Sequence, residues 1–190
     1  ERDELNKFNV VFRHSNLLTK IDLTDISIIS SLARVYVYKN LDLDAVKNIS
    51  TSFSFNLQLD GAIDQTNSML TSDVFKQNGF DVRIADEKFS SSERRIYTYR
   101  FDSQRNEIKV NSNIGTLNPV TGEINFTPIF SDERPTIKLY SAPASNDIVA
   151  RRNTLLQLDI DKTIVVADKD TVSISGAAGA SDYITFNRQD

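Results

Sequence analysis

Neither cysteine nor tryptophan occurs in the 190 residues of this chain, and glycine, proline and histidine are scarce, with 6, 4 and 1 copies. Without cysteine the protein has no disulfide framework and no thiolate ligand or nucleophile. A single histidine cannot complete a tetrahedral zinc site unless several carboxylates join it. Because a chain of this length can bury about 70% of its unfolded surface, we expect a packed apolar core to stabilise it without disulfides or a structural metal ion.

Long apolar runs and an excess of basic residues are also missing. No run approaches the roughly 18 residues that a membrane-spanning helix needs. The chain has 22 Lys and Arg against 26 Asp and Glu, a formal net charge of −4, and phosphate-binding surfaces need the opposite balance. The sequence therefore predicts no membrane and no nucleic-acid partner. Its first residues hold neither methionine nor a signal-peptide core, so we expect a fragment of a longer protein.

Alternation of apolar and polar residues indicates many strands. It is clearest over residues 49–59, where Phe53, Phe55 and Leu57 share the odd-numbered face while serine, asparagine and glutamine occupy the even-numbered face. Shorter stretches of the same kind predict strands over residues 8–13, 32–39, 80–85, 95–101, 136–140, 155–160, 163–167 and 171–175. Pro135 and Pro143 flank one of these, residues 136–140, which is typical of an edge strand.

Helical signal is thin by comparison. Apolar spacing of three to four residues predicts short helices over residues 25–32, 64–77 and 147–156. The expected fold is therefore mainly β with a few short helices, its antiparallel sheets packed as a sandwich-like α+β domain. We expect residues 1–175 to form this β-rich assembly domain, with a division into two sub-domains near residues 60–78 as an option. Residues 176–190 would be a flexible tail with a short extended segment.

One hairpin is predicted with its turn chemistry. Residues 111–126 contain two alternating stretches separated by a turn of Asn118, Pro119, Thr121 and Gly122. Proline presets φ near −65° for the first corner of such a turn. Gly122 can adopt the left-handed conformation that lets the turn close into a hairpin with a bulge.

No constellation of residues points to catalysis or to a cofactor. His14 is the sole histidine, and no Gly-x-Ser-x-Gly motif presents a serine to it, so we expect it to be a polar residue at a strand end. Phosphate-cradling glycine motifs are absent from the sequence. The carboxylate pairs at positions 42/44, 159/161 and 168/170 lack the ligand number and glycine of a calcium loop. We therefore predict no catalytic, metal-binding or cofactor-binding residue, no small-molecule substrate and no enzymatic activity.

Residue types that are common in protein–protein interfaces are easier to find in the sequence than catalytic ones. The sequence has two pairs of adjacent arginines, Arg94 with Arg95 and Arg151 with Arg152. Their guanidinium groups could bind carboxylates of a partner in bidentate fashion, or they could be ordinary exposed pairs. Tyr97 and Tyr99 lie on a predicted strand and could anchor a partner, or they could close a second face of the core. These six residues are our interface candidates.

Several ordered segments resemble the carboxy-terminal part of the baseplate wedge protein of contractile-tailed, T-even-like bacteriophages. Residues 110–124, VNSNIGTLNPVTGEI, are similar to a hairpin of that family. Residues 78–99 are similar to the strand pair that precedes this hairpin, and residues 144–159, ASNDIVARRNTLLQLD, are similar to the family's closing run. Residues 1–60 add only strand-rich patterning and the phrase IISSL at 28–32.

The resemblance implies a structural subunit of the virion tail baseplate, assembled in the host cytoplasm. Its expected partners are a second copy, as a homodimer, and the neighbouring baseplate wedge proteins. The family has no catalytic residues, so none are carried over. The alternative function is a carbohydrate- or receptor-binding β-module of a phage tail fibre, although the absence of tryptophan argues against it.

Overall fold

The computed structural model describes residues 10–26, 28, 30–60, 67–133, 135–150 and 156–167. The chain divides into two compact units, Glu1–Ala33 with Asp147–Asp190, and Arg34–Asn146. Both contain antiparallel strands, so the predicted mainly β, antiparallel class is confirmed. The tail predicted over residues 176–190 lies outside the described residues, and the assembly domain over residues 1–175 stays a prediction.

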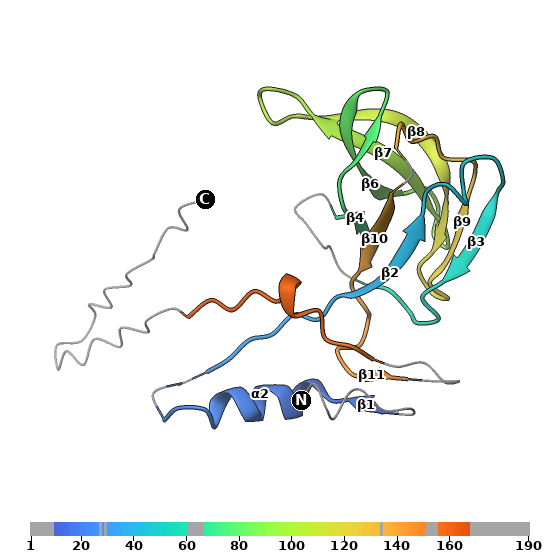
Figure 1. The fold of residues 1–190 in the computed structure, drawn as a ribbon. Coiled ribbons are helices and arrows are strands. Elements are labelled where there is room, and N and C mark those ends of the chain that lie inside the picture. Colours follow the sequence, from blue (N-terminus) through green and yellow to red (C-terminus); the bar gives the residue numbers. More distant parts are fainter. Residues whose placement is uncertain are drawn as a thin grey trace, which may run out of the picture. The chain divides into compact units, whose positions relative to one another are not determined.

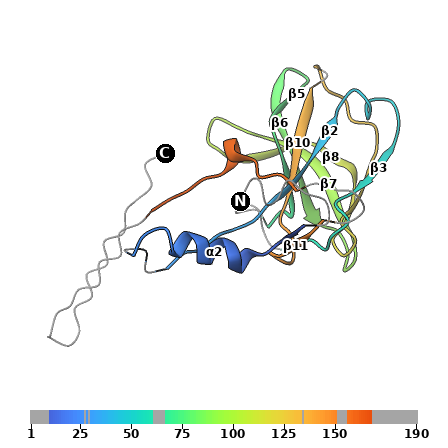
Figure 2. The same ribbon diagram turned by 60° about the horizontal axis from the view of Figure 1, so that its bottom comes forward.

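The first unit is small and thinly packed. It contains β1 (Val11–Phe12), α2 (His14–Asp22), β11 (Ile148–Val149) and a 3-10 helix, η1 (Ile160–Lys162). β1 pairs antiparallel with β11, which joins two segments far apart in the sequence. α2, the blue helix in Figure 2, has no fully buried residue. This unit therefore gains little from apolar burial within its described part.

The second unit is a nine-stranded sheet in the order β2-β10-β4-β6-β7-β8-β9-β3, with β5 paired to β6. It curls into a half-barrel (Figure 1). Its strands are β2 (Val37–Asp42), β3 (Thr51–Ser54), β4 (Leu70–Ser72), β5 (Phe75–Gln77), β6 (Phe80–Lys88), β7 (Arg94–Phe101), β8 (Glu107–Asn118), β9 (Glu123–Phe126) and β10 (Thr136–Ser141).

The concave face of this sheet encloses one apolar core. Side chains from nearly every strand meet there because curling brings the two halves of one face together. The most buried are Leu70, Ile84, Ile96, Ile114, Leu117, Ile124 and Leu139. Tyr97, Tyr99 and Ala85 form a separate buried group.

The β8–β9 hairpin shows two close approaches of backbone to backbone. Gly122 ends its four-residue loop at φ +66°, and its N–H donates to the Asn118 carbonyl over 2.8 Å. Gly115 has φ +151°, and a Cβ there would collide with the carbonyl oxygen of Asn125 on β9. Only glycine therefore fits at position 115 without moving a strand.

The helix predictions were wrong wherever the structure describes them. Residues 67–77 form β4 and β5 instead of a helix, because Leu70 and Phe75 are buried between strands of distant sequence. Ile148–Val149 is β11, and the described residues of 25–32 contain no helix. Within the described residues the α-helix is α2, which begins almost directly after β1, where the sequence predicted only the end of a strand.

Strand boundaries differ as well. The predicted alternation of faces begins at residue 51, since Ile49 is exposed, and the ladder with β9 ends at Ser54 because Asn56 adopts φ +57°. Beyond that point, a single bridge joins Leu59 to Pro143. Residues 156–159 are not a strand, and η1 follows them. β10 lies between β2 and β4, so the edge position inferred from its flanking prolines was wrong.

Candidate interaction site

Four of the six interface candidates lie on β7, and strand alternation divides them between two faces. Arg94 shares the inner face with Ile96 and Thr98, both fully buried. Arg95, Tyr97 and Tyr99 point to the outer face. The pair that looks equivalent in the sequence, Arg94 and Arg95, therefore meets two different environments.

Arg94 is used inside the fold. Its guanidinium Nε donates to Oδ2 of Asp86, and a terminal nitrogen donates to the carbonyl of Asn67 over 2.9 Å. The Asp86 side chain is 0% exposed and that of Arg94 is 11% exposed. The other carboxylate oxygen accepts from the backbone N–H groups of Met69 and Leu70 over 2.8 and 2.7 Å. This network fixes the start of β4 against β6, and it leaves little of Arg94 for a partner.

Tyr97 is covered although it stands on the outer face. Lys109 of β8 and Glu87 of β6 form an ion pair of 2.5 Å from the strands on either side of β7. The Lys109 ammonium lies 4.4 Å from the centre of the Tyr97 ring. Burial, together with a hydrogen bond to Glu107, raises the pKa of Tyr97 above its ordinary value. Tyr97 and Tyr99 are each only 4% exposed, so within one copy they close a second face of the sheet.

Arg95 is the β7 candidate most open to a partner. Its guanidinium lies 4.3 Å from the centre of the Phe89 ring, and Phe89 is 58% exposed. Arginine stacked on an exposed aromatic ring is a common feature of interfaces. Phe89 could not be found from the sequence, because it stands outside any alternating stretch.

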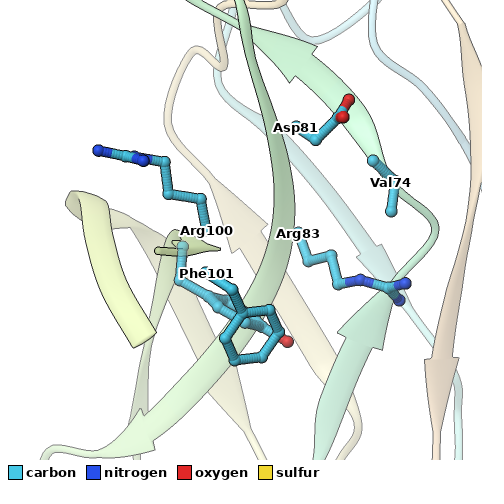
Figure 3. Close-up of a pocket in the computed structure, with 6 residues that line it drawn as sticks. Val74, Asp81, Arg83, Arg100 and Phe101 are labelled. Atoms are coloured by element: carbon cyan, nitrogen blue, oxygen red, sulfur yellow. The ribbon is translucent and has the colours of Figure 1, made fainter. Parts of the chain in front are cut away.

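A hollow lies at the opposite end of β7. It has a volume of about 200 Å³. Tyr99 and Phe101 stack edge to face in its wall, with ring centres 5.4 Å apart. Its lining residues are Val74, Asp81, Arg83, Tyr99, Arg100 and Phe101 (Figure 3). The volume is below the roughly 300–1,000 Å³ of ordinary small-molecule sites.

The remaining sequence candidates are elsewhere. Arg151 and Arg152 lie outside the described residues. The turn residues Pro119 and Thr121 form the β8–β9 loop, where the Asn118 side chain accepts from the N–H groups of Val120 and Thr121. The structure thus separates the turn from the β7 cluster and assigns it to local backbone geometry.

His14 is the first residue of α2, so the expectation from the sequence that it stands at the end of a strand was wrong. Its Nε2 lies 2.9 Å from the Ala33 carbonyl oxygen. The Asp147 carboxylate accepts from the His14 backbone N–H and from Arg13, each over 2.9 Å. These two bonds, that from the His14 N–H first, lower the pKa of Asp147. Over the described ranges, no three His, Cys, Asp or Glu side chains are grouped as metal ligands, and no helix is long and apolar enough to cross a membrane.

The sheet of the second unit has two open edges, β2 and β3. The ammonium of Lys39 on β2 donates to the Ser54 carbonyl of β3, so a side chain links the two edges where no strand ladder joins them. These two edges could not be predicted from the sequence, because the edge position of a strand depends on how strands distant in the sequence pair with one another.

The comparisons with known families bear on the first part of the chain. Residues 1–40 match the family model described as baseplate structural protein gp6, C-terminal domain III. The predicted resemblance to a baseplate wedge protein is confirmed. The match spans β1, α2 and the beginning of β2, where the sequence resemblance was least distinct, and it does not reach the segments 78–99, 110–124 and 144–159. No curated protein and no solved structure matches the chain.

Proposed function

We propose that this protein is a non-catalytic structural subunit of a contractile phage tail baseplate that joins neighbouring subunits. The family match over residues 1–40 is the observation that carries the proposal, since that family is described as a baseplate structural protein. The virion tail baseplate would be its location, and the host cytoplasm the place where it is assembled.

Exposed apolar side chains of the first unit support contacts with other subunits. Leu23 is 79% exposed and Ile26 is fully exposed, and both lie within the matched segment. Ile164, Val165 and Val166 in the same unit are 67–86% exposed. Side chains of this kind gain about 25 cal/mol per Å² when a partner removes them from water. The unit therefore carries apolar surface that its own short elements leave open.

The small size of the hollow and the ion pair at its rim support a non-catalytic role. The hollow is small, and the Asp81 carboxylate at its rim is paired with Lys76 over 2.8 Å. A tail-fibre β-module that binds glycans would use a longer aromatic groove, whereas Phe101 is the one aromatic of this hollow that is exposed. We therefore favour assembly over the carbohydrate-binding alternative.

The test is assembly with and without the matched segment's apolar side chains. We expect the chain to form dimers in sedimentation velocity and to bind neighbouring baseplate wedge proteins in a pull-down. The double variant Leu23→Glu with Ile26→Glu should weaken one of these associations at least tenfold. Val120→Glu, at another exposed apolar position (64% exposed) in the β8–β9 loop, serves as the control. A chain that stays monomeric at all concentrations and binds no wedge protein would refute the proposal.

A further inference from the structure

β3 is an edge strand without the usual protection. It pairs with β9 on one side only. The Phe55 N–H donates to the Gly122 carbonyl over 2.9 Å, so the backbone groups of the odd-numbered residues point toward β9. In an antiparallel pair the residues between them point the other way, so the N–H and C=O groups of Ser52 and Ser54 point to the open side. Edge strands are commonly protected by charged residues or proline. The four residues of β3, TSFS, include neither.

The contact that the structure shows at this open side is a replaceable one. The Lys39 ammonium donates to the Ser54 carbonyl from across the opening between β2 and β3. The Phe53 side chain beside it is half-buried and packs against Phe126, with ring centres 5.7 Å apart. An added strand would receive the backbone bonds of Ser52 and Ser54, and its apolar side chains would cover Phe53.

The first unit holds a segment suited to that position. Residues 163–167 read TIVVA, and Thr163 has the extended backbone angles φ −79° and ψ 120°. Ile164, Val165 and Val166 are 74%, 86% and 67% exposed, and within the described chain they belong to no ladder. Consecutive β-branched residues favour strands, and a strand forms where a neighbouring strand pairs with its backbone groups.

We propose that residues 163–167 of one copy add as a strand to the β3 edge of a second copy. The inference rests on the proposed function, because it names the surfaces through which two copies would associate. The lengths agree, since β3 has four residues and the segment five. Two copies that exchange the segment reciprocally form a closed, two-fold interface, and each copy contributes both an edge and a strand. Lys39 would leave the Ser54 carbonyl when the strand arrives.

Engineered disulfides test this directly, because the chain has no cysteine of its own. Ser52→Cys places a thiol on the edge, and Ile164→Cys, Val165→Cys and Val166→Cys scan the segment. A cross-strand pair forms a disulfide only when its Cα atoms lie within about 7 Å. We expect at least one mixture of an edge variant with a segment variant to yield a covalent heterodimer under mild oxidation. Its yield should exceed tenfold that of the exposed loop variant Ser91→Cys mixed with the same segment variant.

Three outcomes would overturn the inference or separate it from the proposed function. Equal yields from Ser52→Cys and Ser91→Cys at all three scanned positions would refute strand addition. A crosslink that forms only inside a chain carrying both cysteines, at a rate independent of concentration, would show that the segment docks on its own copy. A wild-type chain that dimerises in sedimentation while no pair crosslinks would refute this interface and leave the assembly function standing.

Discussion

Asp86 and Arg94 are diagonal neighbours on the inner face of the β6–β7 hairpin, where Asp86 stands opposite Ile96 and Arg94 opposite Lys88. Their ion pair is almost completely removed from water. A buried pair is strongly coupled to the fold, because loss of one partner leaves the other charge desolvated and uncompensated. The adjacent Arg95 has no such role, since its guanidinium rests on the exposed ring of Phe89.

Substituting the two neighbouring arginines should separate these roles. We expect Arg94→Gln to lower the free energy of unfolding by about 3 kcal/mol, because Asp86 would keep a buried charge without its partner. Arg95→Gln should cost less than about 1 kcal/mol, the range of an exposed cation–π contact. Urea unfolding followed by circular dichroism measures both. Equal losses in the two variants would contradict the assignment of Arg94 to the core.

Two glycines with positive φ should differ in their tolerance of a methyl group. Gly115→Ala should lower the free energy of unfolding by about 3 kcal/mol or more, because the new Cβ meets backbone of β9 and a strand must shift. Gly79→Ala is the matched control, since its φ is +77° and nothing lies within 4 Å of a Cβ there. It should cost only about 1–2 kcal/mol, the left-handed penalty alone. If both variants unfold at the same urea concentration, the close approach at Gly115 is not as described.

The first unit should lose stability in acid through Asp147. Its pKa is lowered in the folded state, so its contribution is fully present above the ordinary carboxyl value of about 3.9 and is lost as the pH falls through the folded pKa. The His14 amide resonance should report this titration in NMR. Asp147→Asn should abolish that transition, while Asp161→Asn, at an exposed position, should leave it unchanged. A His14 amide that titrates identically in all three proteins would disprove the contact.

Tyr97 should remain a neutral phenol in the folded protein at a pH above the ordinary tyrosine pKa of about 10. Because burial and Glu107 raise its pKa, its contribution is present below the ordinary tyrosine value of about 10 and is lost as the pH rises further. Absorbance at about 295 nm during an alkaline titration should show a late phase of tyrosine ionisation that coincides with unfolding. In Tyr97→Phe the amplitude of that late phase should be smaller. A late phase of unchanged amplitude would mean that another tyrosine is the protected one.

The sequence anticipated the strands whose own residues alternate strongly. Val82 and Ile84 on β6, and Ile96 and Thr98 on β7, occupy one face as expected, because a strand's side chains alternate whatever its neighbours are. The glycine of the β8–β9 loop was likewise anticipated, since its left-handed φ follows from local turn chemistry. Residues 67–77 were misassigned to a helix because their apolar residues Met69, Leu70, Val74 and Phe75 are spaced as on one face of a helix. The choice was decided by pairing with β6 and β10.

The candidate site shows the same division. Composition alone pointed to a protein without thiol chemistry, and residue type alone selected arginine and tyrosine as candidate contacts. The tertiary structure decided the rest. It determines which of two adjacent arginines faces the core, that the Lys109–Glu87 ion pair covers Tyr97, and which strands are left as edges. The physical reason is that periodicity is a property of a few consecutive residues. Burial and edge position, in contrast, are created by contacts such as Lys109 with Glu87, or β3 with β9, between segments distant in the chain.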